Sequence, residues 1–190
     1  AERNMSEQII KNRHAYTAGT VGHNALLVDG RGQIAREGAV TEFVSTPAMS
    51  CLTADASQAY GPTVQTCLRR VMSVAPDYYV VFDRVVTDGA ERTVETLLHT
   101  GPSGRFTVAG TTLKTDTERV GNAAQVRGRE GEVAVRFAHP DEVTFVHRRW
   151  PDCDAYGHFL SVATPRSADQ TICWALAAGP AGQVRLDTRP

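Results

Sequence analysis

Residues 78–100 read YYVVFDRVVTDGAERTVETLLHT, and this stretch decides the fold class that the sequence predicts. Its two runs, 78–86 and 92–100, are rich in β-branched and aromatic residues, which favour strands. The turn sequence TDGA separates them, and an Asp-Gly pair between two such runs is typical of a tight hairpin. We therefore predict that the two runs pair as an antiparallel hairpin.

The same pattern of short runs between turn residues continues along the chain. Helical periodicity is almost absent, and only residues 4–16 favour a short helix. The other strand-like runs are 25–30, 39–45, 63–75, 105–110, 123–128, 132–139, 143–150, 158–165, 170–179 and 183–188. About a dozen strands at hairpin spacing predict an all-β fold, a sandwich of two antiparallel sheets with little helix.

The length of 190 residues fits one domain, for which we expect residues 16–190 after an N-terminal segment or linker, residues 1–15. Lys and Arg number 20 and Asp and Glu number 21, so the net charge is −1. This balance gives no basic excess for nucleic acid or an anionic membrane surface. No apolar run approaches the length of about 18 residues that a spanning helix needs. We expect neither nucleic acid nor membrane as a partner.

The chain has four cysteines, at positions 51, 67, 153 and 173, and no two of them form a CxxC motif. This spacing excludes a zinc ribbon. Our first interpretation is buried, unpaired thiols, because free cysteine is commonly buried. An oxidising compartment would favour disulfides instead, and the sequence does not choose among their pairings.

Two polar pairs are candidates for chemistry. His23-Asn24 stands in front of the apolar run 25–30, and an imidazole suits proton transfer because its pKa lies near neutrality. The structural alternative is a strand cap with a turn bond. Arg69-Arg70 offers guanidinium groups that match the geometry of carboxylates. The alternative for this pair is one arginine in solvent and one in a salt bridge.

Two further polar stretches have mainly structural interpretations. Asp83-Arg84 lies within a predicted strand just ahead of a turn, where we expect it to make local bonds. Trp150 ends the basic and aromatic stretch that begins at His147. It could stack on a sugar face, although a tryptophan of a strand is more often part of the core.

Four motifs occur in an order that resembles a known family: GTVGHNALLVDGRGQ (19–33), ADASQAY (54–60), RRVMSVAPDYYVVFDRV (69–85) and TLLHT (96–100). Together they resemble the C-terminal β-sheet domain of the heparinase II/III-like polysaccharide lyases, which include alginate lyases. The resemblance implies a β-sandwich like the supersandwich of these lyases. In such proteins a helical toroid supplies a tyrosine and an asparagine or histidine, and the β-domain supplies a histidine.

The resemblance implies that this chain belongs to an enzyme that cleaves uronate-containing polysaccharide, a glycosaminoglycan or alginate, by β-elimination. It also implies inactivity without the toroid, which would lie in the same or a companion chain, and a periplasmic or secreted location in a bacterium. The rival hypothesis is a non-catalytic carbohydrate-binding or docking module. A gene with several hundred upstream residues rich in helix would favour the lyase.

The resemblance also assigns roles to individual residues. His23 becomes the catalytic histidine, and Asn24 would orient it or bond the sugar. In metal-binding relatives two histidines and an aspartate surround zinc, which here implies His23, Asp55 and His99. Two histidines and a carboxylate with an open position form a sound zinc set. Glu42 is the substitute ligand if Asp55 points away, and Arg69 and Arg70 are expected to bind the acidic substrate.

Overall fold

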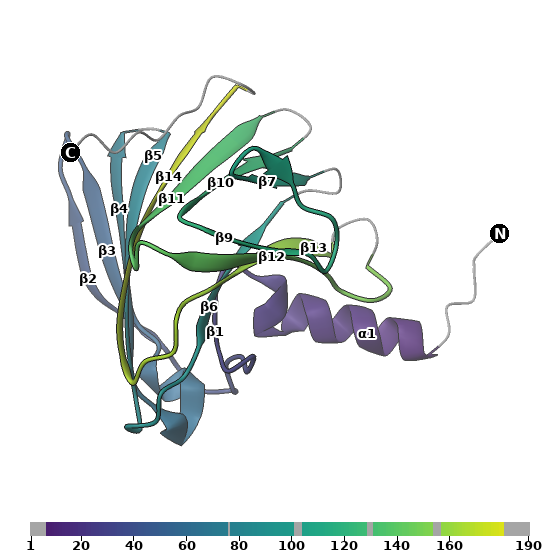
Figure 1. The fold of residues 1–190 in the computed structure, drawn as a ribbon. Coiled ribbons are helices and arrows are strands. Elements are labelled where there is room, and N and C mark those ends of the chain that lie inside the picture. The colour runs from purple at the N-terminus through teal and green to yellow at the C-terminus, as the bar shows by residue number, and fades with distance from the viewer. Residues whose placement is uncertain (1–6, 76, 101–103, 129–130, 154–156, 181–190) are drawn as a thin grey trace.

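The computed structural model describes residues 7–75, 77–100, 104–128, 131–153 and 157–180, and it shows two antiparallel sheets packed face to face (Figure 1). The larger sheet has the order β2-β3-β4-β5-β14-β11-β10-β7-β8, and the smaller has the order β1-β6-β13-β12-β9. The larger sheet comprises β2 (Ala39–Ser45), β3 (Ser50–Asp55), β4 (Val64–Ala75), β5 (Tyr78–Thr87), β14 (Asp169–Gly179), β11 (Glu132–His139), β10 (Ala123–Arg127), β7 (Arg105–Val108) and β8 (Thr111–Thr112). The smaller comprises β1 (Leu26–Val28), β6 (Val94–His99), β13 (His158–Ala163), β12 (Val143–Arg149) and β9 (Glu118–Gly121). The predicted all-β sandwich is confirmed.

Apolar side chains from both sheets meet between the two layers. Along β5, residues 81, 83 and 85 alternate with outward-facing neighbours, as a strand requires. The largest fully buried side chains of the core are Phe106, Phe137, Phe145, Leu97, Leu160 and Ile172. Asp83 is the charged residue among the inward-facing residues of β5, and it is fully buried. Its counter-charge, Arg69, becomes important for the candidate site.

Within the described residues, three helical segments accompany the sheets: α1 (Glu7–Ala18), η1 (Thr20–Gly22) and η2 (Ser57–Thr63). α1 packs through the buried ring of Tyr16 on a small apolar cluster formed by the smaller sheet and the turn after β12. The cluster contains Leu27, Leu97, Cys153 and Phe159. The predicted boundary between residues 15 and 16 therefore falls inside a helix that packs on the sandwich. None of the described helices is both long and apolar enough to span a membrane.

Trp150 helps to fasten α1 to the sheet. Its indole N–H donates to the Asn12 carbonyl oxygen at 2.9 Å, and its ring lies 6.0 Å from that of Tyr16. The side chain is partly buried against the same apolar cluster. Of the two interpretations that the sequence allows, the structure supports packing rather than a free platform for a sugar.

The predicted hairpin of residues 78–86 with 92–100 is wrong. β5 pairs with β4 and β14 in the larger sheet, whereas β6 pairs with β1 and β13 in the smaller. The long strands β4 and β14 occupy both edges of β5, so the next run has no free edge and crosses to the other sheet. Arg92 stabilises this crossing, because its guanidinium lies 2.9 Å from Asp88 Oδ2 and 3.0 Å from Asp29 Oδ2.

Three strands were not predicted from the sequence: β3, β8 and β9. β8 has only two residues, and β9 is largely exposed and polar, so neither carries a strong apolar pattern. The motif ADASQAY covers the end of β3 and the start of η2. The predicted run 183–188 lies outside the described residues.

The four cysteines are unpaired in the structure. Cys67 and Cys153 are buried, and Cys51 and Cys173 are partly exposed. Burial raises the pKa of the Cys67 thiol to about 12. A thiol with so high a pKa remains protonated and is a poor nucleophile.

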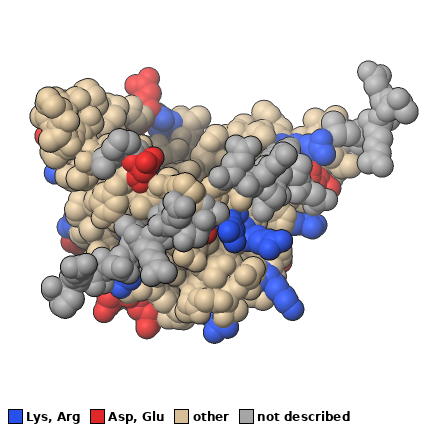
Figure 2. Space-filling model, turned by 90° about the horizontal axis from the view of Figure 1, so that it is seen from above, with Lys and Arg blue, Asp and Glu red and all other residues tan. Residues whose placement is uncertain are grey.

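Charge is distributed in small patches on the face that Figure 2 shows. Lys and Arg side chains lie in separate groups, with Asp and Glu between or beside them, on a surface that is otherwise mostly uncharged. This mixture agrees with the net charge of −1.

Candidate functional site

Residues 21–24, which are the last two residues of η1 and the two that follow it, form a tight turn that presents His23 to solvent, and we call this segment the corner. His23 and Asn24 are both exposed. A side chain on Gly22 would place its Cβ only 2.1 Å from the carbonyl oxygen of Tyr16 in α1. Glycine is therefore required where the corner passes the helix, which accounts for the residue that precedes His23.

His99, at the end of β6, fastens the corner. Its Nε2 lies 2.9 Å from the Val21 carbonyl oxygen, and its Nδ1 lies 3.0 Å from Asn24 Oδ1. Its backbone N–H donates to the same Asn24 oxygen at 2.8 Å. Because a backbone N–H only donates, this bond determines which end of the Asn24 amide faces His99. The His99 ring also stacks on Phe159, with centroids 5.1 Å apart.

Both ring nitrogens of His99 face oxygen atoms that accept hydrogen bonds. A neutral imidazole has one N–H, so it can donate to Val21 or to Asn24 but not to both at once. Burial lowers the pKa of His99, the bond to the Val21 carbonyl opposes this shift, and the nearby His23 adds to the lowering. His99 is therefore mainly neutral at pH 7, and its ring holds the corner through one donated bond.

His23 is oriented by the end of α1. Its Nε2 lies 3.2 Å from the Thr17 carbonyl oxygen. Since a carbonyl oxygen only accepts, Nε2 carries the proton in the neutral ring. The lone pair then resides on Nδ1, for which the described residues provide no partner. His23 is thus an exposed imidazole with a defined tautomer and a nitrogen able to accept a proton.

Arg69 fastens the corner from the larger sheet. Its Nε and one terminal nitrogen donate to the two carboxylate oxygens of Asp83 at 2.6 and 3.0 Å. Its other terminal nitrogen donates to the Asn24 carbonyl oxygen at 2.8 Å. Burial opposes the charge of Arg69, but Asp83 outweighs burial and raises the arginine's pKa. Trp174 completes the network by donating to Asp83 at 3.2 Å.

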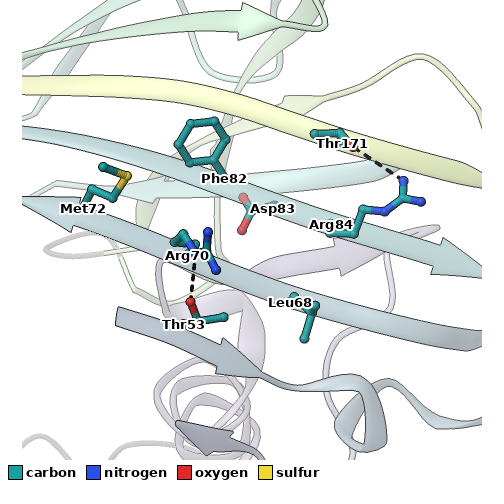
Figure 3. A pocket seen from close by; sticks show the side chains of 8 residues that line it. All are labelled: Thr53, Leu68, Arg70, Met72, Phe82, Asp83, Arg84 and Thr171. Atoms are coloured by element: carbon teal, nitrogen blue, oxygen red, sulfur yellow. Dashed lines mark hydrogen bonds between the residues drawn. The ribbon is translucent and has the colours of Figure 1, made fainter. Parts of the chain in front are cut away.

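Arg70 points to the opposite face of the larger sheet, because successive side chains of a strand alternate. There it borders a hollow of about 430 Å³, which we call the outer hollow (Figure 3). Its lining residues are Thr53, Leu68, Arg70, Met72, Phe82, Asp83, Arg84 and Thr171. Arg69 and Arg70 therefore cannot clamp one carboxylate together, which corrects the pairwise substrate site predicted from the sequence. Of the two, only Arg70 is exposed.

The predicted zinc ligands do not form a metal site in the part of the chain that the structure describes. No three His, Cys, Asp or Glu side chains gather there as a group that could hold a metal ion. Asp55 accepts bonds from the Ser57 hydroxyl at 2.5 Å and backbone N–H at 2.8 Å, and these bonds lower its pKa. The substitute ligand, Glu42, bonds Arg70 and Thr53. Zinc therefore stays a prediction without support from these contacts.

The sequence did not reveal the residues that hold His23 and His99 in place. Thr17 and Tyr16 come from α1, and Phe159 comes from a strand distant in sequence. Their contacts are a carbonyl group and two ring faces, which leave no motif in the sequence. Phe82 and Arg84 of the outer hollow were also missed as a site, although alternation along β5 places them on one face.

The sandwich is similar to solved structures of polysaccharide lyases. A heparan sulfate lyase HepC from Pedobacter heparinus has a TM-score of 0.66 at 12% identity, covering 96% of this chain and 28% of that one. A heparinase III structure has a TM-score of 0.58 at 16% identity, and the match covers 90% of this chain and 25% of that one. Another heparinase III has a TM-score of 0.64 at 12% identity, and the match covers 95% of this chain and 27% of that one. Identities this low show the fold alone.

The chain belongs to the family described as "Heparinase II/III-like, C-terminal", which matches residues 4–182. Comparison with curated proteins gives no match. The chain spans about a quarter of the length of the solved structures described above. The resemblance that the four sequence motifs indicate is therefore confirmed at the level of the family.

Proposed function

We propose that this chain is the β-sandwich domain of a lyase that cleaves uronate-containing polysaccharide by β-elimination. Membership of the heparinase II/III-like family supports a lyase-related role. The observation that carries the proposal is the corner, where the exposed His23 stands on a fixed backbone and its Nδ1 has no partner among the described residues. Proton abstraction requires a base that is already oriented, because the base must first lie within hydrogen-bond reach of the proton that it removes.

The proposed reaction breaks a C–H bond and a C–O bond of the polysaccharide. A base removes the proton alpha to the uronate carboxylate, the electron pair forms a carbon–carbon double bond, and the glycosidic oxygen leaves with a proton from an acid. Negative charge develops on the carboxylate side, so a nearby cation or hydrogen-bond donor lowers the barrier. His23 would accept the proton at Nδ1 or, when protonated, neutralise the carboxylate.

Asn24 supports the same site through its other amide atom. Its oxygen is bonded by His99, whereas its Nδ2 has no partner among the described residues. An amide N–H₂ next to the catalytic imidazole would donate to a sugar hydroxyl or carboxylate oxygen. Both groups therefore come from the two consecutive residues that the sequence analysis singled out.

We also propose that a helical domain, in the same or a companion chain, completes the active site. The chain spans about a quarter of the length of the solved lyase structures, so about three quarters of each of those proteins has no counterpart in this chain. The acid that protonates the leaving oxygen would come from that domain. A glycosaminoglycan or alginate substrate is found outside the cytoplasm, so we place the protein in the periplasm or the medium.

The test is an elimination assay on the longer protein that joins this chain to its helical domain. We expect ultraviolet absorbance of the unsaturated uronate to grow with heparan sulfate or with alginate, and His23→Ala to lower the rate by about 100-fold or more. His14→Ala, an exposed histidine on α1, is the matched control and should keep the rate. An unchanged rate in His23→Ala, or full activity of the 190-residue chain alone, would contradict the proposal.

A further inference from the structure

We propose that the outer hollow binds an acidic saccharide at a second site, separate from the corner. The class of ligand rests on the proposed function, whereas the site itself rests on Arg70, Phe82 and Arg84. These residues come from the neighbouring strands β4 and β5, and Figure 3 shows them around one depression of the sheet surface. Binding here would hold the polysaccharide on the domain without taking part in the elimination.

Strand register arranges four side chains of the outer hollow as a square. Arg70 pairs with Phe82, and Leu68 pairs with Arg84. The two arginines therefore lie on one diagonal, and the two apolar side chains lie on the other. Diagonal neighbours in an antiparallel pair have a separation of about 7–8 Å. The guanidinium groups thus flank a central apolar surface from opposite sides.

This arrangement matches the two chemical faces of a uronate sugar. Phe82 is 38% exposed, and such an aromatic surface can stack on the C–H face of a sugar ring. Guanidinium forks bind carboxylates through two parallel hydrogen bonds. The exposed Thr171 hydroxyl lies at the same surface, whereas Thr53 is buried and its hydroxyl bonds Glu42 and Arg70. A volume of about 430 Å³ lies within the range of small-ligand sites and accommodates a short oligosaccharide.

Both arginines already have acidic partners, but these ion pairs are exposed and exchangeable. Arg70 bonds Glu42 at 3.0 Å, with the two side chains 50% and 49% exposed. Arg84 donates to Asp169 Oδ2 at 2.7 Å, again with both side chains about half exposed. Ion pairs of this exposure contribute little stability. A sugar carboxylate can therefore replace Glu42 or Asp169, and the binding will be weak and sensitive to salt.

The larger sheet separates the outer hollow from the corner. Arg69 faces the interior and bonds Asn24 and Asp83, whereas Arg70 faces outward. A sugar that contacts Phe82 lies across the sheet from the corner and does not contact His23. The two sites are therefore independent, and each can be removed without the other.

The experiment measures binding to the 190-residue chain by calorimetry and by amide chemical shifts in NMR. The probes are a hexasaccharide of alternating glucuronate and N-acetylglucosamine, a hexasaccharide of mannuronate, and an uncharged glucose hexasaccharide. We expect either acidic probe to bind and to shift the amides of β4 and β5. Phe82→Ala should weaken binding about tenfold, which corresponds to about 1.4 kcal/mol. Arg70→Gln should weaken it by a similar factor.

Matched variants make the result specific. Phe43→Ala removes another exposed phenylalanine, 66% exposed on β2 and outside the hollow, and should leave binding unchanged. Glu42→Gln releases Arg70 from its ion pair and should tighten binding of the acidic probes by about threefold, since about 0.6 kcal/mol is typical of an exposed pair. His14→Ala, which changes an exposed histidine on α1 that belongs to neither site, should bind as the unchanged chain does.

Several results would overturn the proposal. These are no binding of either acidic hexasaccharide at millimolar concentration, equal binding of the uncharged probe, or full binding by both Phe82→Ala and Arg70→Gln. None of them depends on catalysis, so they are distinguishable from failure of the proposed function. A different result is a longer protein that lacks lyase activity while Phe82→Ala still weakens binding to the 190-residue chain. That result would contradict the proposed function and support the second site.

Discussion

Arg69 and Arg70 are neighbours in the sequence, yet they lie in two different regions of the molecule. Arg69 is largely buried and bonded to fully buried Asp83 and to the corner, whereas Arg70 is half-exposed and paired with a half-exposed glutamate. One arginine thus fixes the backbone of the corner, whereas the other forms an ion pair that a ligand can replace. The difference teaches that burial of the counter-ion, rather than the presence of arginine, decides the role.

The two regions also differ in what they leave free. In the corner, His99 and Arg69 bond three oxygen atoms of residues 21–24, and the described residues provide no partner for the side-chain atoms His23 Nδ1 and Asn24 Nδ2. In the outer hollow, the apolar surface of Phe82 is open and the ion pairs around it face solvent. The corner therefore suits chemistry that needs a pre-oriented group, and the hollow suits reversible binding.

The largest expected effect comes from removing the buried arginine. Arg69→Gln should lower the free energy of unfolding by about 3–5 kcal/mol, because Asp83 would keep a buried charge without its counter-charge. Arg70→Gln, the adjacent control, should lower it by at most about 1 kcal/mol. Urea denaturation of the two variants checks the contrast. If the two variants lose the same free energy of unfolding, burial of the ion pair does not decide its contribution to stability.

Removal of the Asn24 side chain should destabilise the corner less than removal of Arg69. Asn24→Ala should reduce the free energy of unfolding by about 1–2 kcal/mol, because the His99 backbone N–H and ring lose their shared acceptor. NMR should also show faster motion of His23. Gln65→Ala, an exposed amide on β4, serves as the control and should change stability by less than about 0.5 kcal/mol. A corner that stays rigid in Asn24→Ala would mean that Arg69 alone fixes it.

The pH dependence of stability separates the two regions, because His99 titrates in the corner and no histidine lines the outer hollow. Burial lowers the pKa of folded His99 below the unfolded value of about 6.5, so the unfolded chain binds more protons. Stability is then fully present above about pH 6.5 and is lost as the pH falls through that value towards the folded pKa.

We therefore expect the free energy of unfolding to decrease between pH 7.5 and pH 5.5, by up to about 1 kcal/mol from this group. His99→Gln should show a shallower decrease, measured by urea denaturation at both pH values. The pKa of His147 is also lowered by burial, and its contribution should persist in the variant. The same slope in both proteins would remove His99 as a cause.

The smallest expected effect lies in the exposed pair of the hollow. Arg84→Gln should change the free energy of unfolding by about 0.5 kcal/mol, and about 1 M salt should abolish the difference by screening the pair with Asp169. Thermal unfolding in low and high salt checks it. A loss above about 2 kcal/mol that survives high salt would show that the hollow is as firmly bonded as the corner.

Much of the candidate site could be predicted from the sequence because its signals are local. His23 and Asn24 were identified from their place before an apolar run, and the structure exposes both. Arg69 and Arg70 fit the alternative of one salt-bridged and one solvent-exposed arginine only in part, because the exposed Arg70 also forms an ion pair, with Glu42. The roles of His99 and Asp55 were harder, because their bonds to Asn24 and Ser57 come from pairings that no spacing rule expresses.

By itself, the sequence determined the class of fold. Alternation of apolar and polar residues along short runs specifies strands with one buried face, and many such runs can bury those faces only as packed sheets. Alternation also determined that residues 69 and 70 face opposite sides of β4. These properties depend on neighbours in the chain, which the sequence displays directly.

Only the tertiary structure decided which strands pair and what fastens the corner. The turn sequence TDGA predicted a hairpin, but β4 and β14 occupy both edges of β5, and β6 joins the other sheet. That outcome brings His99 beside Asn24 and Val21, 75 and 78 positions earlier in the chain. Competition among strands for edges is settled by the packing of the whole domain, which no local pattern contains.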